Sequence, residues 1–270
     1  MPELFKLENI EYHYIKSKVA LSGINLNIKE GGITSIVGSN GSGKSTLLNI
    51  LCGLEFPTNG KICFRGNEFS EKSFKDAAFN ITFRSSIGYV FQNTESQLFC
   101  PTVYDELLFG PLQLNLTKEE AYSRADEIME MLQIQELRDR PVYMLSGGEK
   151  KRVAIGAILT VNPDVLVIDE PVSGLDPKTR AFLIELIFKL SDAGKSIIIA
   201  THHLELVNHL QSSVVVLSEN HSIAKTGSCS EILSDTDLLL KNNLIGEYPH
   251  RHNKEIHKHI STGFLFHNHK

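Results

Sequence analysis

The chain has 270 residues and a mass of 30.1 kDa, enough for one large domain or two ordinary ones. Hydrophobic residues make up 41% and charged residues 22%, so the chain can bury a core and global disorder is excluded. Lys and Arg total 27 against 32 Asp and Glu, a net charge of -5. This balance argues against a nucleic-acid partner, because phosphate contacts need concentrated basic charge.

No apolar run reaches the roughly 20 residues that a membrane-spanning helix needs. The first ten residues, MPELFKLENI, lack the basic and then apolar layout of a signal peptide. We therefore expect a soluble, cytosolic chain. The four cysteines form no CxxC pair, so we expect reduced thiols and neither a disulfide nor a zinc site: Cys52, Cys63, Cys100 and Cys229.

Strand-like and helix-like segments alternate along the chain, which predicts an α/β domain. Several of the strand-like runs are apolar at consecutive positions, as in parallel strands that are covered on both faces. A helix is expected from Lys178 to Asp192, just after Pro177, because its apolar residues fall on one stripe. The expected strands are Ile33–Val37, Ile87–Val90, Val165–Ile168, Ser196–Ala200 and Val214–Leu217.

Between about Thr102 and Thr160 the sequence pattern predicts several consecutive helices, with a break at Gly110-Pro111. We predict a main domain over residues 1–235, with a helical subdomain inserted at about 100–160. Residues 236–270 are expected to form a C-terminal extension, which is rich in His and Lys from Pro249 onward.

A phosphate-binding loop of the form G-x-x-x-x-G-K-[ST] follows the first of these strands. Glycines let successive backbone N–H groups point at phosphates, and the start of the next helix adds positive potential. Lys44 would reach the outer phosphates, and the Ser45 hydroxyl would ligate Mg²⁺. The predicted nucleotide-binding residues of this loop are Gly38, Ser39, Asn40, Gly41, Ser42, Gly43, Lys44, Ser45 and Thr46.

Two carboxylates end the strand Val165–Ile168, at the sheet edge where open α/β sheets bind ligands. Asp169 is the expected Mg²⁺ partner, directly or through water. Glu170 is placed to act on the attacking water as a general base or orienting group. An ordinary strand end before a turn at Pro171 is the alternative for this pair alone.

The motif Leu145-Ser146-Gly147-Gly148-Glu149 resembles the signature of ATP-binding-cassette (ABC) ATPases, and the other motifs of that family occur in order. The resemblance implies a P-loop NTPase core with an inserted helical subdomain and N-terminal antiparallel β elements, and it implies ATP and Mg²⁺ as cofactors. It assigns further roles: an adenine-stacking aromatic at Tyr14, with Tyr12 as the weaker candidate, a glutamine loop at Gln92 that also ligates Mg²⁺, a D-loop at Asp176 and a switch histidine at His202.

In this family the signature residues Ser146 to Glu149 grip the ATP of a second subunit, so the resemblance implies a homodimer or a heterodimer with a related ATPase subunit. Two positions depart from the family's usual residues. Glu149 stands where Gln is most common, and His203 stands where Asp follows the switch histidine. Neither change removes a catalytic group.

The segment from Gln92 through Asp105-Glu106 to Leu112, with the run SGGEKKRVA, resembles the cobalt/nickel and energy-coupling-factor importers. This implies a transmembrane coupling subunit and a substrate-binding membrane component as partners, at the cytoplasmic face of the membrane. The open alternatives are the ATPase of a vitamin importer, an ABC ATPase without a transport role that acts on DNA or ribosomes, and a metal-storage or sensing protein.

Six of the eleven histidines fall in the last 21 residues. They form three H-x-H pairs, and imidazole is a ligand for nickel, cobalt, zinc and copper. A solvated tail that binds metals only weakly is the alternative. The candidate transition-metal residues are His250, His252, His257, His259, His267 and His269.

Overall fold

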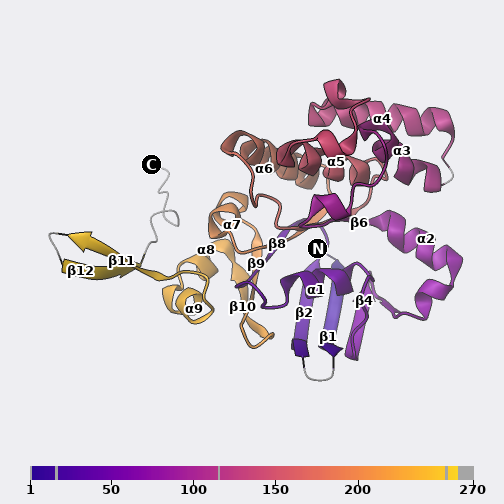
Figure 1. Cartoon of the computed structure of the whole chain (residues 1–270). Coiled ribbons are helices and arrows are strands. Elements are labelled where there is room, and N and C mark those ends of the chain that lie inside the picture. Colours follow the sequence, from indigo (N-terminus) through magenta and orange to yellow (C-terminus); the bar gives the residue numbers. More distant parts are fainter. Residues whose placement is uncertain (1, 16–17, 115, 253–254, 261–270) are drawn as a thin grey trace.

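The computed structural model describes residues 2–15, 18–114, 116–252 and 255–260, with side chains up to residue 246. The centre of this part of the chain is a six-stranded sheet (Figure 1). Five parallel strands follow the order β9-β3-β8-β7-β6, and β10 pairs antiparallel with β9 at the edge. The strands are β3 (Gly32–Val37), β6 (Ile87–Val90), β7 (Val165–Asp169), β8 (Ser196–Thr201), β9 (Ser213–Leu217) and β10 (Ile223–Ser228). The predicted α/β class and all five predicted strands are confirmed.

Both faces of the central sheet are buried, which explains why its strands are continuously apolar. Along β7, Leu166 and Ile168 belong to a core shared with α5 (Gly147–Leu159) and α6 (Pro177–Asp192). Val165 and Val167 belong to a second core on the opposite face, shared with α1 (Lys44–Leu51) and the N-terminal sheet. The alternation of side chains thus divides one strand between two cores.

The second sheet is antiparallel, with the order β2-β1-β4-β5, and it covers the face of the core that holds α1 (Figure 1). Its pairing shifts register at several points of β1 and β2, so these strands are bent. The predicted N-terminal antiparallel elements are therefore present. Their bounds are β1 (Glu3–Ile15), β2 (Lys18–Lys29), β4 (Asn59–Phe64) and β5 (Asn67–Phe69), followed by the turn η1 (Ser73–Lys75) and α2 (Ala77–Ser86).

A group of helices lies between β6 and β7 in the chain, where the sequence predicts a helical insert (Figure 1). The two strands themselves are neighbours in the sheet. The group packs through buried residues such as Leu107, Ala125 and Val153, which join the α5–α6 core. The elements are η2 (Thr94–Ser96), α3 (Val103–Gln113), α4 (Lys118–Leu132), η3 (Gln135–Leu137), η4 (Val142–Met144) and α5. Pro111 lies inside α3 and does not end it at Gly110.

The last helices pack beside the edge of the central sheet. Leu239 and Ile245 join a third core with Val37 and Val216. The helices are α7 (Leu204–Leu210), α8 (Cys229–Leu233) and α9 (Thr236–Lys241). The predicted tail contains an antiparallel hairpin, β11 (Glu247–His252) with β12 (Glu255–Ile260), and residues 261–270 lie outside the described residues. Within the described residues, no helix is both long enough and apolar enough to cross a membrane.

Candidate functional site

The loop between β3 and α1 has the backbone geometry of an anion cradle. Gly43 adopts φ 105°, and a Cβ atom there would lie 2.4 Å from the carbonyl oxygen of Ala20. Only glycine fits this position, because both the left-handed backbone and the close approach exclude a side chain. No side chain caps the start of α1, so its first N–H groups are available to a ligand.

Lys44, the first residue of α1, is buried at the bottom of this loop. Its ammonium group donates to the carbonyl oxygens of Gly38 at 2.8 Å and Ser39 at 3.1 Å. Burial lowers the pKa of Lys44, while the charges of Glu170 and Asp169 oppose that shift. The loop therefore holds a desolvated cation next to free backbone donors, which suits an anionic phosphate chain.

Asp169 ends β7 opposite this loop and is buried. Burial raises the pKa of its carboxyl above the ordinary value, with Glu170 adding to the shift and Ser45, Lys44 and Lys151 opposing it. The Oδ1 atom of Asp169 is buried and has no hydrogen-bond partner among the described residues. A buried acceptor oxygen beside a hydroxyl fits Mg²⁺, which prefers oxygen ligands, so these residues match the implied metal.

Glu170 is held in a strained backbone conformation with φ 46°, which non-glycine residues rarely adopt. Three contacts fix its carboxylate. The Thr201 hydroxyl donates to Oε2 at 2.9 Å, the His202 backbone N–H donates to Oε1 at 3.1 Å, and His202 Nδ1 lies 2.7 Å from Oε1. Residues 32 positions apart meet because β7 and β8 are neighbours, with Asp169 paired to Ala200.

The loop before α1, Asp169 and Glu170 line one cavity of about 530 Å³. Tyr14 lines it and is half exposed, with its hydroxyl 2.9 Å from Thr46 Oγ1. Tyr12 is buried and donates its hydroxyl to Glu55, so it is not available as a stacking surface. The lining is Tyr14, Lys18, Val19, Ala20, Asn40, Gly41, Gly43, Lys44, Ser45, Thr46, Gln92, Asp169, Glu170 and His221.

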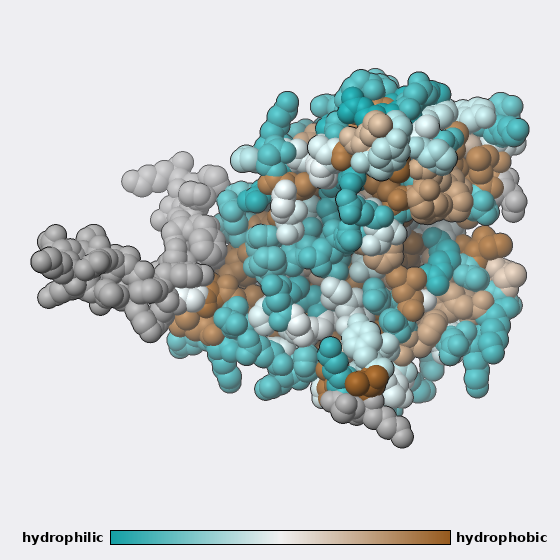
Figure 2. Space-filling model, in the orientation of Figure 1, coloured by the Kyte–Doolittle hydropathy of each residue, from teal (hydrophilic) through white to brown (hydrophobic). Residues whose placement is uncertain are grey.

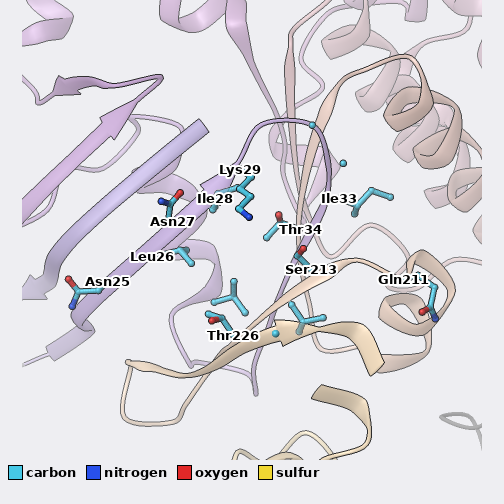
Figure 3. A pocket seen from close by; sticks show the side chains of 15 residues that line it. Asn25, Leu26, Asn27, Ile28, Lys29, Ile33, Thr34, Gln211, Ser213 and Thr226 are labelled. Carbon is cyan, nitrogen blue, oxygen red and sulfur yellow. The ribbon is translucent and has the colours of Figure 1, made fainter. Parts of the chain in front are cut away.

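A second cavity of about 580 Å³ opens between β2 and the edge strands of the central sheet (Figure 3). Its labelled polar groups are amides, hydroxyls and one ammonium group, such as Asn25, Thr34 and Lys29. No carboxylate or histidine is among the described residues that line it. The carboxylates that suit Mg²⁺ therefore lie in the first cavity.

The predicted signature residues lie outside the lining of the first cavity, at the start of α5. Ser146 and Glu149 form a capping box: the Glu149 N–H donates to Ser146 Oγ at 3.4 Å, and the Ser146 N–H donates to Glu149 Oε2 at 2.7 Å. The backbone hydrogen bond from Ser146 lowers the pKa of Glu149. Asp176 caps α6 in the same way by accepting from the Thr179 N–H at 3.0 Å.

Sequence reasoning gave no site role to three residues. Thr201 holds Glu170, Lys151 donates to the carbonyl oxygen of Phe91 at 3.2 Å, and the His203 ring lies against that of His202, tilted by 35° with ring centroids 4.1 Å apart. Burial lowers the pKa of Lys151 to about 8. Burial, followed by the neighbouring His202, also lowers the pKa of His203. The hydroxyl next to a predicted switch histidine was the available signal for Thr201.

Comparison with known proteins agrees with this geometry. A sequence model of the family described as ABC transporter matches residues 21–173. The nickel import ATP-binding protein NikO of Rhodobacter capsulatus is 43% identical, over 91% of this chain and 97% of that protein. The energy-coupling factor transporter ATP-binding protein EcfA of Methanosphaera stadtmanae is 37% identical, over 88% of this chain and 84% of that protein.

Two solved structures are also similar. One is CbiO1 of Clostridium perfringens, described as part of the CbiONQ transporter complex, with 35% identity, a TM-score of 0.76, and coverage of 90% of this chain and 96% of that one. The other is the dimeric, post-hydrolysis cassette MJ0796 bound to ADP and Pi, with 29% identity, a TM-score of 0.75, and coverage of 84% and 99%.

Proposed function

The chain is an ATPase of the ABC transporter family, and from that premise we propose that it powers the import of nickel or cobalt ions. The observation that carries the proposal is the full-length similarity to a nickel import ATP-binding protein. It is joined in this chain by Lys44, Asp169 and Glu170, which line one cavity, and by His202, which contacts Glu170. The main domain assigned to residues 1–235 contains all of these groups.

ATP binding follows from the loop and its surroundings. Backbone N–H groups from Gly38 to Thr46 surround the phosphates, and Lys44 exchanges its loop carbonyls for phosphate oxygens. The half-exposed Tyr14 ring is available to stack on the adenine. Ser45, Gln92 and Asp169 would hold Mg²⁺, which neutralises charge on the phosphates when bound.

Hydrolysis uses the carboxylate of Glu170. In our proposal a water attacks the γ-phosphorus, the bond to the bridging oxygen breaks towards ADP, and the water proton passes to Glu170. Thr201 holds Oε2 and His202 holds Oε1 of this carboxylate, and Glu170 lines the cavity. The strained backbone at Glu170 indicates that this position is set by function at some cost in stability.

Dimerisation would complete the site. Ser146 and Gly147 begin a helix whose N–H groups attract anions, but they do not line the cavity of their own chain. We propose that they bind the γ-phosphate on a second copy or a related subunit, as the dimeric cassette in the comparison suggests. Asp176, capping α6 nearby, would lie at the same interface.

A transmembrane coupling subunit would dock on the segment after Gln92. Phe99 and Phe109 are exposed and contact each other edge to face, with ring centroids 4.9 Å apart. Figure 2 shows apolar residues gathered on the side of the molecule where Figure 1 places α3 and α2. Lys151 ties the carbonyl of Phe91 to α5, so movement of this surface would be passed to the signature helix.

The location proposed for the chain is therefore the cytoplasmic face of the membrane, as a peripheral subunit together with the coupling subunit and a substrate-binding membrane component. Uptake assays test whether the chain powers the import of nickel or cobalt ions. Cells that express the chain with its membrane subunits should accumulate nickel or cobalt, and the Glu170→Gln variant should not. Accumulation of a vitamin instead would establish the alternative of a vitamin importer. Copurification with ribosomes or DNA would overturn both.

The C-terminal hairpin supports a metal cargo. Its register pairs His250 with His257, Tyr248 with His259, and His252 with Glu255. In this register His250 and His257 are cross-strand partners, and His252 and His259 each stand two positions from one of them. We propose that these four histidines bind nickel or cobalt, since imidazole suits both ions. His267 and His269 lie outside the described residues.

Titration of NiCl₂ and CoCl₂ into the full chain tests the hairpin. The variant with His250→Ala and His257→Ala should lose affinity on the order of tenfold or more, because two ligands are removed. A matched variant with Arg251→Ala and Lys258→Ala changes two residues of the same hairpin, leaves the four histidines in place and should bind normally. Equal affinity in all three proteins would remove the hairpin from the proposal.

A further inference from the structure

A second group of metal-ligating side chains lies at the edge of the nucleotide cavity. Glu170, His202 and His203 each offer one ligand atom, and these three atoms all lie within 4.8 Å of one another. Tetrahedral zinc with bonds of about 2.1 Å needs ligand atoms about 3.4 Å apart. Small rotations of the side chains would therefore bring this cluster into coordinating geometry.

His203 contributes an independent observation. Its Nε2 atom is buried and has no hydrogen-bond partner within the part of the chain that the structure describes. Its ring lies against that of His202. Successive side chains of a strand point to opposite faces, but here the chain turns from β8 into α7, which brings the two rings together. Buried polar nitrogens normally have partners, so an unpaired one on a residue of this cluster points to a ligand.

The donor set indicates which ions would bind. Two imidazoles and one carboxylate form a common ligand set for zinc, and nitrogen ligands also suit nickel and cobalt. Magnesium prefers oxygen ligands and keeps several waters, so it would not favour this cluster. The site is therefore distinct in chemistry from the Mg²⁺ position at Ser45 and Asp169.

We propose that Glu170, His202 and His203 bind a transition-metal ion such as Zn²⁺, Co²⁺ or Ni²⁺, and that the bound ion stops ATP hydrolysis. A carboxylate that is bound to a metal ion no longer accepts a proton from water, and His202 is withdrawn from its contact with Glu170. Inhibition rests on the proposed role of Glu170, whereas binding of the ion rests on the cluster alone. Neither depends on the transported cargo.

The inhibition test uses the full chain, constant Mg-ATP and increasing ZnCl₂ or CoCl₂. His203→Asn removes one ligand from the cluster. Asn is favoured at the N-cap position that His203 occupies without a side-chain cap, so this variant should fold. The metal concentration for half inhibition should rise on the order of 10- to 100-fold. His209→Asn removes an exposed histidine from the same helix and should change nothing. Equal inhibition of all three proteins would overturn the proposal.

A direct binding measurement separates this site from the hairpin and from the nucleotide. ZnCl₂ is titrated into the nucleotide-free chain by calorimetry, in both the native protein and His203→Asn. The native chain should show one more tight site than the variant, and the hairpin should contribute equally to both. An unchanged number of sites would overturn the cluster as a metal site. Because this measurement involves no membrane subunit, its result is independent of any failure to transport metal.

Discussion

Two helices of this chain begin with residues suited to anions, but their ends are built differently. The start of α1 follows Gly43, has no side-chain cap, and faces a cavity with buried Lys44. The start of α5 is closed by its own capping box, in which Ser146 and Glu149 satisfy each other's backbone N–H groups. A free helix end costs stability unless a ligand satisfies it, whereas a capped end is stable alone.

The difference indicates two kinds of anion site. The α1 end is prepared within one chain, since the carboxylates of β7 and the loop already face each other. The capping box of α5 uses the N–H groups of Ser146 and Glu149, so a phosphate from a second subunit would be bound by the remaining N–H groups of the first turn. The proposed mechanism therefore needs a strong anion site within the chain and a weaker one between chains. The weaker site is conditional, because it forms only when a second subunit is present.

The largest expected effect belongs to the first site. Glu170→Gln should lower ATP turnover on the order of 10²- to 10⁴-fold, because a neutral amide cannot accept the water proton. ATP binding should remain, which an equilibrium binding assay measures beside the hydrolysis rate. Glu185→Gln, at an exposed carboxylate paired with Lys189, is the control. Near-normal turnover in Glu170→Gln would contradict the assignment of Glu170.

Lys44→Ala tests whether the α1 end depends on its buried cation. The substitution removes a charge-assisted contact of about 1.5–3 kcal/mol, so ATP affinity should fall about 10- to 150-fold. Lys189→Ala removes an exposed lysine and should bind ATP as the native chain does. If Lys44→Ala keeps full affinity and an unchanged melting temperature, backbone donors alone would account for phosphate binding.

Ser146→Ala tests the conditional site, and we expect ATPase activity to fall about tenfold through loss of one hydrogen bond to phosphate. The sharper experiment mixes this variant with Glu170→Gln. In a dimer with shared sites, a mixed pair contains one site with both Glu170 and Ser146 intact, so the mixture should exceed the sum of the separate activities. Activity that is only the average of the two would show that α5 acts within its own chain.

The sequence predicts the site within the chain better than the conditional one. Continuous apolar runs identify parallel strands, and Asp169 and Glu170 after such a run must lie at the sheet edge. The contact between Glu170 and His202 was not predictable, because periodicity does not say that β7 and β8 are neighbours. The burial of His203 Nε2 without a hydrogen-bond partner also depends on tertiary packing, so no local sequence pattern predicts it.

The smallest expected effect concerns the cap itself. Glu149→Gln keeps the capping box but removes a negative charge from the first turn of α5, at a cost of about 0.3–1 kcal/mol. The folded protein holds the pKa of Glu149 below the ordinary value of 4.5 through the Ser146 N–H. A lowered folded pKa adds stability above the unfolded pKa, and this contribution is lost as pH falls through the folded pKa.

Denaturant unfolding of the native chain and Glu149→Gln should therefore differ at neutral pH and converge as the solution is acidified below the ordinary glutamate pKa. The control is Glu119→Gln, which removes an acidic residue from the first turn of α4, where Thr117 and Glu120 supply the cap. The loss of unfolding free energy in Glu119→Gln should not exceed the helix-dipole contribution of about 0.3–1 kcal/mol. A Glu149→Gln difference that is independent of pH would show that the shape and packing of the side chain, and not its charge, stabilise the α5 end.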